Sequence, residues 1–318
     1  MSTVAASACS ELGVAPTVYT CYDVFDLAPL CGIIDFTDGK YIDDRNDRAA
    51  YLAAQERQAE YLLDQVQCGA GTRLLDVGCG YGRILQHATR RGGQAIGITI
   101  SPHQMAYCRA QGLEAYEINY RHIFEKGLAW EHAFDSLVAN GSLEHFVQVI
   151  DAAEGRTDAI YEEMFAICRR LIRASGRFVT TAIHFREHRQ FDPREILKGH
   201  RAHPPGSPNY HLSMLQETMG GWYPEPGQLQ QCASPHFELI EEEDGTRDYH
   251  LTSEYWLRRF KTRLATSPRL WWNLAVKWWR SPEALQEMLR CQLRDQSWFW
   301  QFRPPAPMRL LRQTWLAK

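Results

Sequence analysis

The chain has 318 residues, of which 45% are hydrophobic, 12% aromatic and 23% charged. This composition is typical of a globular protein and excludes wholesale disorder, and the length suits about two domains or one α/β domain with a substantial insertion. The 35 Lys and Arg residues against 38 Asp and Glu leave a net charge of -3, which disfavours binding to nucleic acid or another polyanion.

The nine cysteines are scattered without a Cys-x-x-Cys spacing, so we expect neither a disulfide framework nor a metal site. The N-terminal residues lack the basic patch and apolar run of a secretory signal. No apolar stretch reaches the roughly 18 residues of a membrane-spanning helix. These features predict a cytoplasmic protein with at most peripheral membrane contact.

The first fifty residues are loosely patterned and predict an arm that wraps over the rest of the chain. An amphipathic helix is expected over residues 51–67, and after it short apolar strands alternate with helices. The expected strands cover residues 74–77, 95–99, 115–118, 136–139 and 177–183. The expected helices cover residues 84–91, residues 102–111 with Ser101 as N-cap, and a long segment with Ile160, Met164, Ile167 and Leu171 on one face. Strands that are buried on both faces and alternate with helices predict a parallel doubly wound sheet.

The segment after the fifth strand is rich in His, Pro and Gly and loses its periodicity as far as Pro235, which predicts a loop-like cap or lid. Beyond it we expect a strand over residues 237–240, a helix over 253–263 and a tryptophan-rich helical region over 270–302. Residues 308–316 are expected to form a late edge strand. The tryptophans are expected to pack in the core and lid, and the alternative is that one helix face contacts lipid or an acyl chain.

The sharpest motif is a strand that runs into a glycine-rich turn and opens a helix, Leu74-Leu75-Asp76-Val77-Gly78-Cys79-Gly80-Tyr81-Gly82. Glycines at alternate positions let the backbone approach a ligand closely. Asp-x-Gly-x-Gly-x-Gly after the first strand is similar to the arrangement of S-adenosylmethionine methyltransferases, in which the turn meets the amino-acid and ribose portions of the cofactor. The alternative is a tight turn that needs glycine for its conformation only, with Asp76 capping it.

The second strand ends in Gly97-Ile98-Thr99-Ile100-Ser101-Pro102-His103-Gln104, without the acidic residue that often binds ribose. Gly-Ile-Thr-x-Ser followed by glutamine resembles the cyclopropane fatty acid synthase and mycolic acid cyclopropane synthase family, where this segment contacts the adenosine. Other stretches that resemble family motifs are Asn119-Tyr120-Arg121, the run from Phe134 to Phe146 with its Glu144-His145 pair, Gly220 to Gly227, and Asp248 to Trp256. The resemblance is collinear from about Tyr22 to the C-terminus.

The resemblance implies a Rossmann-like class I methyltransferase fold of the α/β class, with a mostly parallel seven-stranded sheet and a helical and loop cap insertion. The expected parts are an N-terminal arm over residues 1–50 that covers the active site, the methyltransferase domain over 51–184 and 236–318, and the cap over 185–235. The residues that it implies for binding S-adenosylmethionine are Asp76, Gly78, Gly80, Gly82, Thr99, Ile100, Gln104, Asn119 and Tyr120.

The family transfers the sulfonium methyl group to a carbon-carbon double bond, so a base must afterwards remove a proton from the resulting cation. In the family that base resembles a bound bicarbonate held by a cysteine, a glutamate, a histidine and a tyrosine. The resemblance carries three of these over to Cys31, Glu144 and Tyr249 as catalytic residues. Thr181 stands where the family has the histidine, with His184 three residues later, so bicarbonate binding stays open.

Each of these residues also has a structural interpretation. Cys31 can be a small buried hydrophobe, Glu144 can start a helix near its positive end, and Tyr249 can be a core aromatic residue. The histidines of the lid have no metal-ligand spacing, so we expect them to be solvated lid residues. They are His184, His188, His200, His203 and His211.

The residues and the resemblance together predict an S-adenosylmethionine-dependent C-methyltransferase that acts, through a carbocation, on an alkene carbon of an unsaturated acyl or lipid substrate. A second hypothesis keeps the fold and the cofactor but assigns a soluble natural-product or isoprenoid substrate, because the lid is rewritten and a basic membrane-facing patch is lacking. A third is a catalytically silent S-adenosylmethionine-binding partner of a larger assembly. The sequence leaves the oligomeric state open, as well as the choice between a ring, a methylene and a methyl branch in the product.

Overall fold

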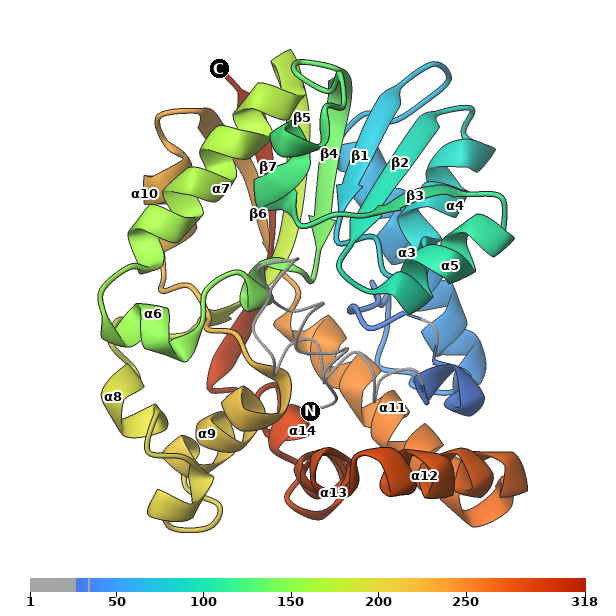
Figure 1. Ribbon diagram of the computed structural model, residues 1–318, viewed down its shortest axis with the longest axis vertical. Coiled ribbons are helices and arrows are strands. Elements are labelled where there is room, and N and C mark those ends of the chain that lie inside the picture. Colours follow the sequence, from blue (N-terminus) through green and yellow to red (C-terminus); the bar gives the residue numbers. More distant parts are fainter. Residues whose placement is uncertain (1–26, 34) are drawn as a thin grey trace.

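The computed structural model describes residues 27–33 and 35–318, which fold around one mixed sheet (Figure 1). Residues 1–26 of the expected N-terminal arm lie outside the described residues. The described residues form seven strands in the order β3-β2-β1-β4-β5-β7-β6. The strands are β1 (Arg73–Val77), β2 (Gln94–Thr99), β3 (Glu114–Glu117), β4 (Phe134–Asn140), β5 (Ile172–Phe185), β6 (Phe237–Asp244) and β7 (Met308–Ala317). Because β7 alone among them runs opposite to the other strands, the expected mostly parallel seven-stranded sheet is confirmed.

Helices cover both faces of the sheet (Figure 1). One face carries α3 (Arg48–Gln65), α4 (Arg83–Arg90) and α5 (Pro102–Ala110), and the other carries α7 (Thr157–Leu171) and α10 (Gln228–Ala233). Short helical segments complete these connections: η2 (Tyr120–Lys126) lies between β3 and β4, and η3 (Leu143–His145) and α6 (Val149–Ala153) lie between β4 and α7. The central strands β1 and β4 are covered in this way and mostly buried, which suits their largely apolar sequences.

Side-chain caps set where two of the helices begin. The Ser101 hydroxyl accepts a hydrogen bond from the Gln104 amide at 3.3 Å, so the predicted N-cap of α5 is confirmed. The Asp47 carboxylate accepts one from the Ala50 amide at 2.9 Å, and α3 therefore begins three residues before the expected helix. Both caps pair backbone donors that the first turn of a helix leaves free.

Strand β7 is not at the edge of the sheet, so that prediction is wrong. It lies between β5 and β6, and most of its ten residues are buried. The edge belongs to β6, whose Glu241 to Asp244 segment is largely exposed and acidic. Charged side chains on an exposed edge oppose pairing with other chains. The order along the chain does not reveal that the last strand inserts between two earlier ones.

The segment between β5 and β6 is about half helical, as the helical and loop cap of the resemblance implied, although its residue pattern alone predicted loops. It contains α8 (Pro193–Ile196), η4 (His200–Ala202), α9 (Pro208–Met219) and α10. In α9 eight of the 12 residues are buried, including Tyr210, Ser213 and Gln216. A helix buried on most sides, partly through polar residues, lacks the one-sided apolar stripe that reveals a helix in a sequence.

A second group of helices lies between β6 and β7, beyond the ends of the strands and beside α8 and α9 (Figure 1). It comprises α11 (Thr246–Thr266), α12 (Pro268–Arg280), α13 (Pro282–Leu289), a π-helical turn η5 (Arg290–Arg294) and α14 (Ser297–Trp300). Helix α9 packs against α13 and α14. The expected division assigned residues 236–318 to the methyltransferase domain. In the structure β6 and β7 of this region lie in the sheet, and α13 and α14 between them pack against the cap helix α9. Within the described residues, none of the helices has the length and apolar character needed to cross a bilayer.

Candidate functional site

The glycine-rich turn after β1 is held against two neighbouring strands. Its three glycines have positive φ angles of 93° at Gly78, 51° at Gly80 and 79° at Gly82. The amides of Gly78 and Cys79 both donate to the Ile98 carbonyl at 2.9 Å. A Cβ on Gly78 would lie 2.7 Å from the Cβ of Ser142, so the turn accepts only glycine at this position.

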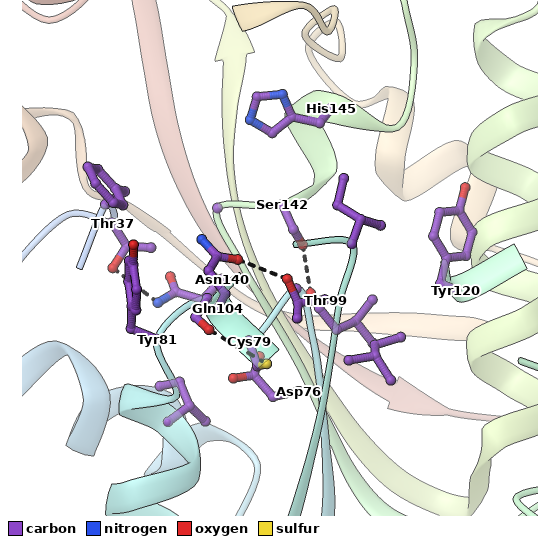
Figure 2. A pocket seen from close by; sticks show the side chains of 18 of the residues that line it. Thr37, Asp76, Cys79, Tyr81, Thr99, Gln104, Tyr120, Asn140, Ser142 and His145 are labelled. Carbon is purple, nitrogen blue, oxygen red and sulfur yellow. Dashed lines mark hydrogen bonds between the residues drawn. The ribbon is translucent and has the colours of Figure 1, made fainter. Parts of the chain in front are cut away.

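A cavity lies above this turn at the carboxyl ends of β1, β2 and β4. Figure 2 shows Asp76, Thr99 and Asn140 around it, together with Thr37 from the N-terminal segment. Of the nine residues predicted to bind the cofactor, eight line the cavity: Asp76, Gly78, Gly80, Thr99, Ile100, Gln104, Asn119 and Tyr120. The ninth, Gly82, does not line it. Gly82 caps α4 instead, and a Cβ there would meet the Leu113 and Cys108 side chains at 2.7 and 2.9 Å.

Asp76 brings a buried carboxyl group to this cavity. Only 2% of the residue is exposed, and burial raises the pKa of its carboxyl well above the usual value. Its Oδ1 atom finds no hydrogen-bond donor among the described residues. A buried acceptor of this kind is suited to a ligand that brings its own N–H or O–H donors.

The ends of β2 and β3 supply a polar and an aromatic wall. The Thr99 hydroxyl donates to Gln104 Oε1 at 2.8 Å, which fixes the glutamine side chain over the cavity. The Tyr120 ring stacks on Phe146 with centroids 4.3 Å apart. Together with Ile98 and Ile118, which also line the cavity, these groups suit a flat heterocycle that is apolar on its faces and polar at its edge.

The N-terminal segment closes the cavity from the other side, through Asp35, Phe36 and Thr37. Arg83 Nε lies 2.9 Å from Asp35 Oδ2, and Asn140 Nδ2 donates to the Thr37 hydroxyl at 3.2 Å. Sequence reasoning expected an arm here but singled out none of these three residues, because no motif surrounds them.

A buried ion cluster anchors the same segment. The Arg312 guanidinium of β7 is fully buried between Asp38 and Asp248, and its Nη2 lies 2.8 Å from Asp248 Oδ2. The Gly39 amide donates to the Thr252 hydroxyl of α11 at 2.9 Å. The covering segment is therefore fixed to both the sheet and α11.

Glu144 occupies a second cavity that adjoins the first, since Phe36, Gly141 and His145 line both. Its Oε1 accepts a hydrogen bond from the Ile183 amide at 2.8 Å, while its buried Oε2 finds no donor among the described residues. Burial raises the pKa of the Glu144 carboxyl to about 7. The group therefore titrates close to neutral pH, as a general base requires.

The cap fixes the backbone of Glu144. The Trp222 amide donates to the Glu144 carbonyl at 3.0 Å, and a Cβ on Gly221 would lie 2.1 Å from the same oxygen. The glycine pair in the Gly220 to Gly227 stretch therefore permits this close approach, which any side chain at position 221 would prevent.

Tyr249 also lines this cavity and belongs to an aromatic cluster. Its hydroxyl donates to the Phe36 carbonyl at 3.2 Å, and its ring stacks on Phe302 with centroids 4.3 Å apart. It meets Trp256 and Trp298 edge to face at 6.0 and 6.1 Å. The aromatic residues that line the second cavity are Phe36, Tyr223, Tyr249, Trp256, Phe260, Trp298 and Phe299, and none of its described lining residues is Lys or Arg.

Cys31 is not brought to Glu144 and Tyr249. It ends the short helix η1 (Ala28–Cys31), and it is not among the residues that line the cavity, although Ile33 is. Burial raises the pKa of its thiol to about 11. Its surroundings are those of the small buried hydrophobe that the sequence left as an alternative.

The four groups of the family's bicarbonate site are therefore not assembled in the described structure. Thr181 donates its hydroxyl to Asn140 Oδ1 at 2.7 Å, and His184 is buried but does not line the second cavity. With Cys31 also outside the cavity, these residues do not fit a bicarbonate ion.

The histidines are neutral or engaged elsewhere. His145 lines both cavities, and burial lowers its pKa to about 4. His184 and the cap residue His200 are both buried, and His200 is paired with Glu217, so the expectation of solvated histidines is wrong for these two. His211 Nδ1 lies 3.0 Å from the Ser297 hydroxyl. Among the described residues we find no group of three or more side chains placed to hold a metal.

The comparison with known proteins decides the family. A family model described as mycolic acid cyclopropane synthetase matches residues 42–281. The chain belongs to this family. It is thus a member of a family of S-adenosylmethionine-dependent methyltransferases and has the class I methyltransferase fold, as the resemblance implied.

Individual relatives are distant. The cyclopropane-fatty-acyl-phospholipid synthase of Escherichia coli is 25% identical over 218 residues, which cover 65% of this chain and 47% of that protein. The aligned part thus spans about half of the length of that curated relative. The cyclopropane synthase MmaA2 of Mycobacterium tuberculosis superposes with a TM-score of 0.73 at 16% identity, over 95% of this chain and 97% of that chain. The mycolic acid cyclopropane synthase CmaA1, in complex with SAH (S-adenosylhomocysteine) and CTAB, gives 0.67 at 19% identity, over 92% and 95%.

Proposed function

We propose that this methyltransferase transfers a methyl group to an alkene carbon of an unsaturated acyl chain. The observation that carries the proposal is the junction of two cavities. One has the glycine turn and the buried Asp76 oxygen, and the other is an aromatic chamber with one buried carboxyl group, Glu144.

The first cavity fits S-adenosylmethionine, which supplies an electrophilic methyl group when bound. Asp76 Oδ1 would accept a hydrogen bond from the ligand, and the backbone at Gly78 and Gly80 lets it approach without interference from a Cβ. Thr99 and Gln104 would meet its polar edge, with Tyr120 beside them. These roles explain why the first cavity is lined both by the Asp76 oxygen that lacks a hydrogen-bond donor and by a turn made of glycines.

The aromatic chamber suits an alkene that gains positive charge as its carbon is methylated. The faces of Tyr249, Trp256 and Trp298 carry negative electrostatic potential and attract a cation. Few polar groups compete with the alkene there, and alignment in a confined space lowers the entropic part of the barrier.

In this proposal Glu144 takes the proton that the substrate loses after methylation. Its Oε2 is free within the described structure, and its pKa of about 7 makes the carboxylate available near neutral pH. The Oε2 atom of Glu144 takes the role of base that the bicarbonate ion has in the family, since the residues of this chain do not fit that ion. Tyr249 acts as a positioning residue, since its hydroxyl holds the covering segment at Phe36.

An acyl chain is the substrate that the surrounding surfaces favour. A third cavity adjoins the chamber through Phe260 and Gln292, and its lining is almost entirely apolar, with Leu270, Leu274 and Leu285 among its residues. A substrate with a long hydrocarbon tail would fill it. The name of the Escherichia coli relative, an acyl-phospholipid synthase, agrees with this class.

A neutral soluble alkene is the second candidate. It is favoured by Thr181, which stands in place of the family's histidine, and by Cys31, which does not line the chamber. Solved structures of geranyl diphosphate methyltransferases share the fold, with TM-scores of 0.57 to 0.58. A diphosphate group needs cationic partners, and no Lys or Arg lines the described chamber. This candidate is therefore confined to substrates without such a group.

Methyl-labelled S-adenosylmethionine separates these candidates. The enzyme is incubated with a total lipid extract and, separately, with the water-soluble metabolites of the same cells. Label in the saponified fatty acids supports the proposal, and label confined to soluble products supports the second candidate. If the protein binds SAH but neither fraction acquires label, the result supports the third hypothesis, a catalytically silent binding protein.

A further inference from the structure

Helix α12 carries a stripe of exposed tryptophans. Trp271, Trp272, Trp278 and Trp279 are 59%, 72%, 51% and 89% exposed. At the 100° per residue of an α-helix they fall within an arc of about 120°. Leu270 and Leu274 are buried on another side of the same helix.

This stripe differs from the other exposed apolar residues of the described surface. Those are Ile42, Leu52, Ile150, Leu197 and Ile240, and they lie singly on separate elements. Scattered apolar residues are ordinary, whereas a gathered set marks an interaction surface. Tryptophan is the side chain most suited to the boundary between lipid headgroups and acyl chains, because its ring is apolar and its N–H is polar.

The charge of α12 indicates which surface it fits. Its sequence contains Arg269, Lys277 and Arg280 and no acidic residue. The acidic residues that follow, Glu283 and Glu287, belong to α13, and Glu287 Oε1 lies 3.4 Å from Arg201 Nη2. At 100° per residue, Arg269 and Arg280 lie beyond one edge of the tryptophan stripe, whereas Lys277 lies on the side of Leu270. A helix with an apolar stripe and basic residues on the rest of its surface favours anionic lipid.

The inner side of α12 continues into the substrate region. Leu270 and Leu274 line the third cavity, which adjoins the Glu144 chamber through Phe260 and Gln292. One helix therefore has its tryptophans at the surface and its leucines on an apolar cavity next to the reaction site. Its place in the fold, at the end of the molecule away from the sheet, is seen in Figure 1.

We propose that α12 docks the enzyme on an anionic bilayer surface, with the four tryptophans in the headgroup boundary and the basic side chains on lipid phosphates. Docking brings the apolar cavity next to the membrane, so that an acyl chain enters it without crossing water. The proposed docking is argued from the surface of α12 alone. Only the delivery of an acyl chain to the cavity depends on the proposed function.

Vesicle co-sedimentation tests the docking without substrate turnover. The full chain, without S-adenosylmethionine, is mixed with vesicles of phosphatidylcholine alone or with phosphatidylglycerol added. We expect clear binding to the anionic vesicles, and a loss of roughly tenfold in partition coefficient for the double variant Trp272→Ser/Trp279→Ser. Ile42→Ser, which removes a 74% exposed apolar residue elsewhere, is the matched control and should bind like the wild type.

The charge contribution is measured separately. Arg269→Gln/Arg280→Gln should lower binding to anionic vesicles by on the order of tenfold while leaving the weaker binding to phosphatidylcholine unchanged. Arg48→Gln, at an exposed position on α3, is the control for an unrelated lost charge. An unchanged preference for anionic vesicles in the α12 variant would overturn the electrostatic part.

Other outcomes overturn the proposal as a whole. They are a wild type that stays in the supernatant with both vesicles, and a tryptophan variant that binds as well as the wild type. A wild type that elutes as a dimer and becomes monomeric in the tryptophan variant would instead assign the stripe to a second copy of the chain. Unchanged melting temperature and SAH affinity show that the variants are folded, and methyl labelling of lipid tests the proposed function independently of vesicle binding.

Discussion

The two halves of the site are built in different ways. The cofactor cavity is formed mainly by residues that directly follow β1, β2, β3 and β4, so that short contiguous motifs supply most of its lining. The Glu144 chamber draws on the N-terminal segment, the end of β4, α9, α11 and α14, which are far apart in the sequence. Binding of the cofactor therefore depends on local backbone geometry, whereas the shape of the chamber depends on how the cap packs.

The two buried carboxyl groups show the same contrast. Both Asp76 and Glu144 have an oxygen without a donor in the described structure, and burial raises the pKa of each. Asp76 faces a cavity lined by other polar groups, where a bound ligand can supply the missing hydrogen-bond donor. Glu144 faces aromatic rings, so its free oxygen is available to a substrate proton.

Replacing Glu144 is the strongest test of this division. Glu144→Gln keeps the shape of the side chain but removes the base, so turnover should fall by about 10²- to 10⁴-fold, while SAH affinity stays unchanged. The measurement combines methyl-transfer rates with isothermal titration. Glu162→Gln, at an exposed position on α7, is the control. Full turnover in the Glu144 variant would remove the proposed role.

The glycine turn should show the opposite behaviour. Gly78→Val places a Cβ against Ser142 and strains a residue with a φ angle of 93°, so SAH affinity should fall by roughly 100-fold or more. Gly69→Ala is the control, because no atom lies within 4 Å of a Cβ built there. If titration gives the same dissociation constant for wild type and Gly78→Val, the cavity does not bind the cofactor.

The pH dependence of turnover tests whether Glu144 acts as the base. The Glu144 pKa is raised to about 7, so the base form, and with it the maximal rate under saturating cofactor, should grow about tenfold between pH 6 and pH 8. The pKa of Glu144 is higher in the folded state than the usual value of 4.5, which applies to the unfolded chain. The stabilisation that the protonated Glu144 contributes to the free energy of unfolding is therefore complete below pH 4.5 and is lost as the pH rises to about 7. A rate that does not change across this range would contradict the assignment of Glu144 as base.

The smallest effect is expected at Cys31. Cys31→Ala removes a buried sulfur outside the chamber lining, so it should cost about 1 kcal/mol of stability and leave turnover unchanged, with or without added bicarbonate. Thermal unfolding and rate measurements on the same preparation check both parts. A large loss of rate at unchanged stability would restore the catalytic role that the resemblance implied.

Sequence reasoning was most successful where a residue's role depends on its immediate neighbours. The turn from Gly78 to Gly82 and the Ser101 cap lie where they were expected, because glycine φ angles and cap hydrogen bonds are set within a few residues. Glu144 and Tyr249 were found only through the resemblance. Their neighbours Phe36 and Thr37 carried no signal, since an apolar and a small polar residue in an irregular segment have no distinguishing pattern.

The sequence by itself determined the strands and helices that alternate around the sheet, the glycine turn and the residues at the strand ends, because these follow from periodicity and from local backbone constraints. Only the tertiary structure decided that β7 inserts between β5 and β6, that α9 is a buried helix, and that Cys31 stays outside the chamber. It also decided that the tryptophans of α12 face outward. These outcomes depend on which distant surfaces pack together, and side-chain packing between segments two hundred residues apart leaves no periodic trace in the chain.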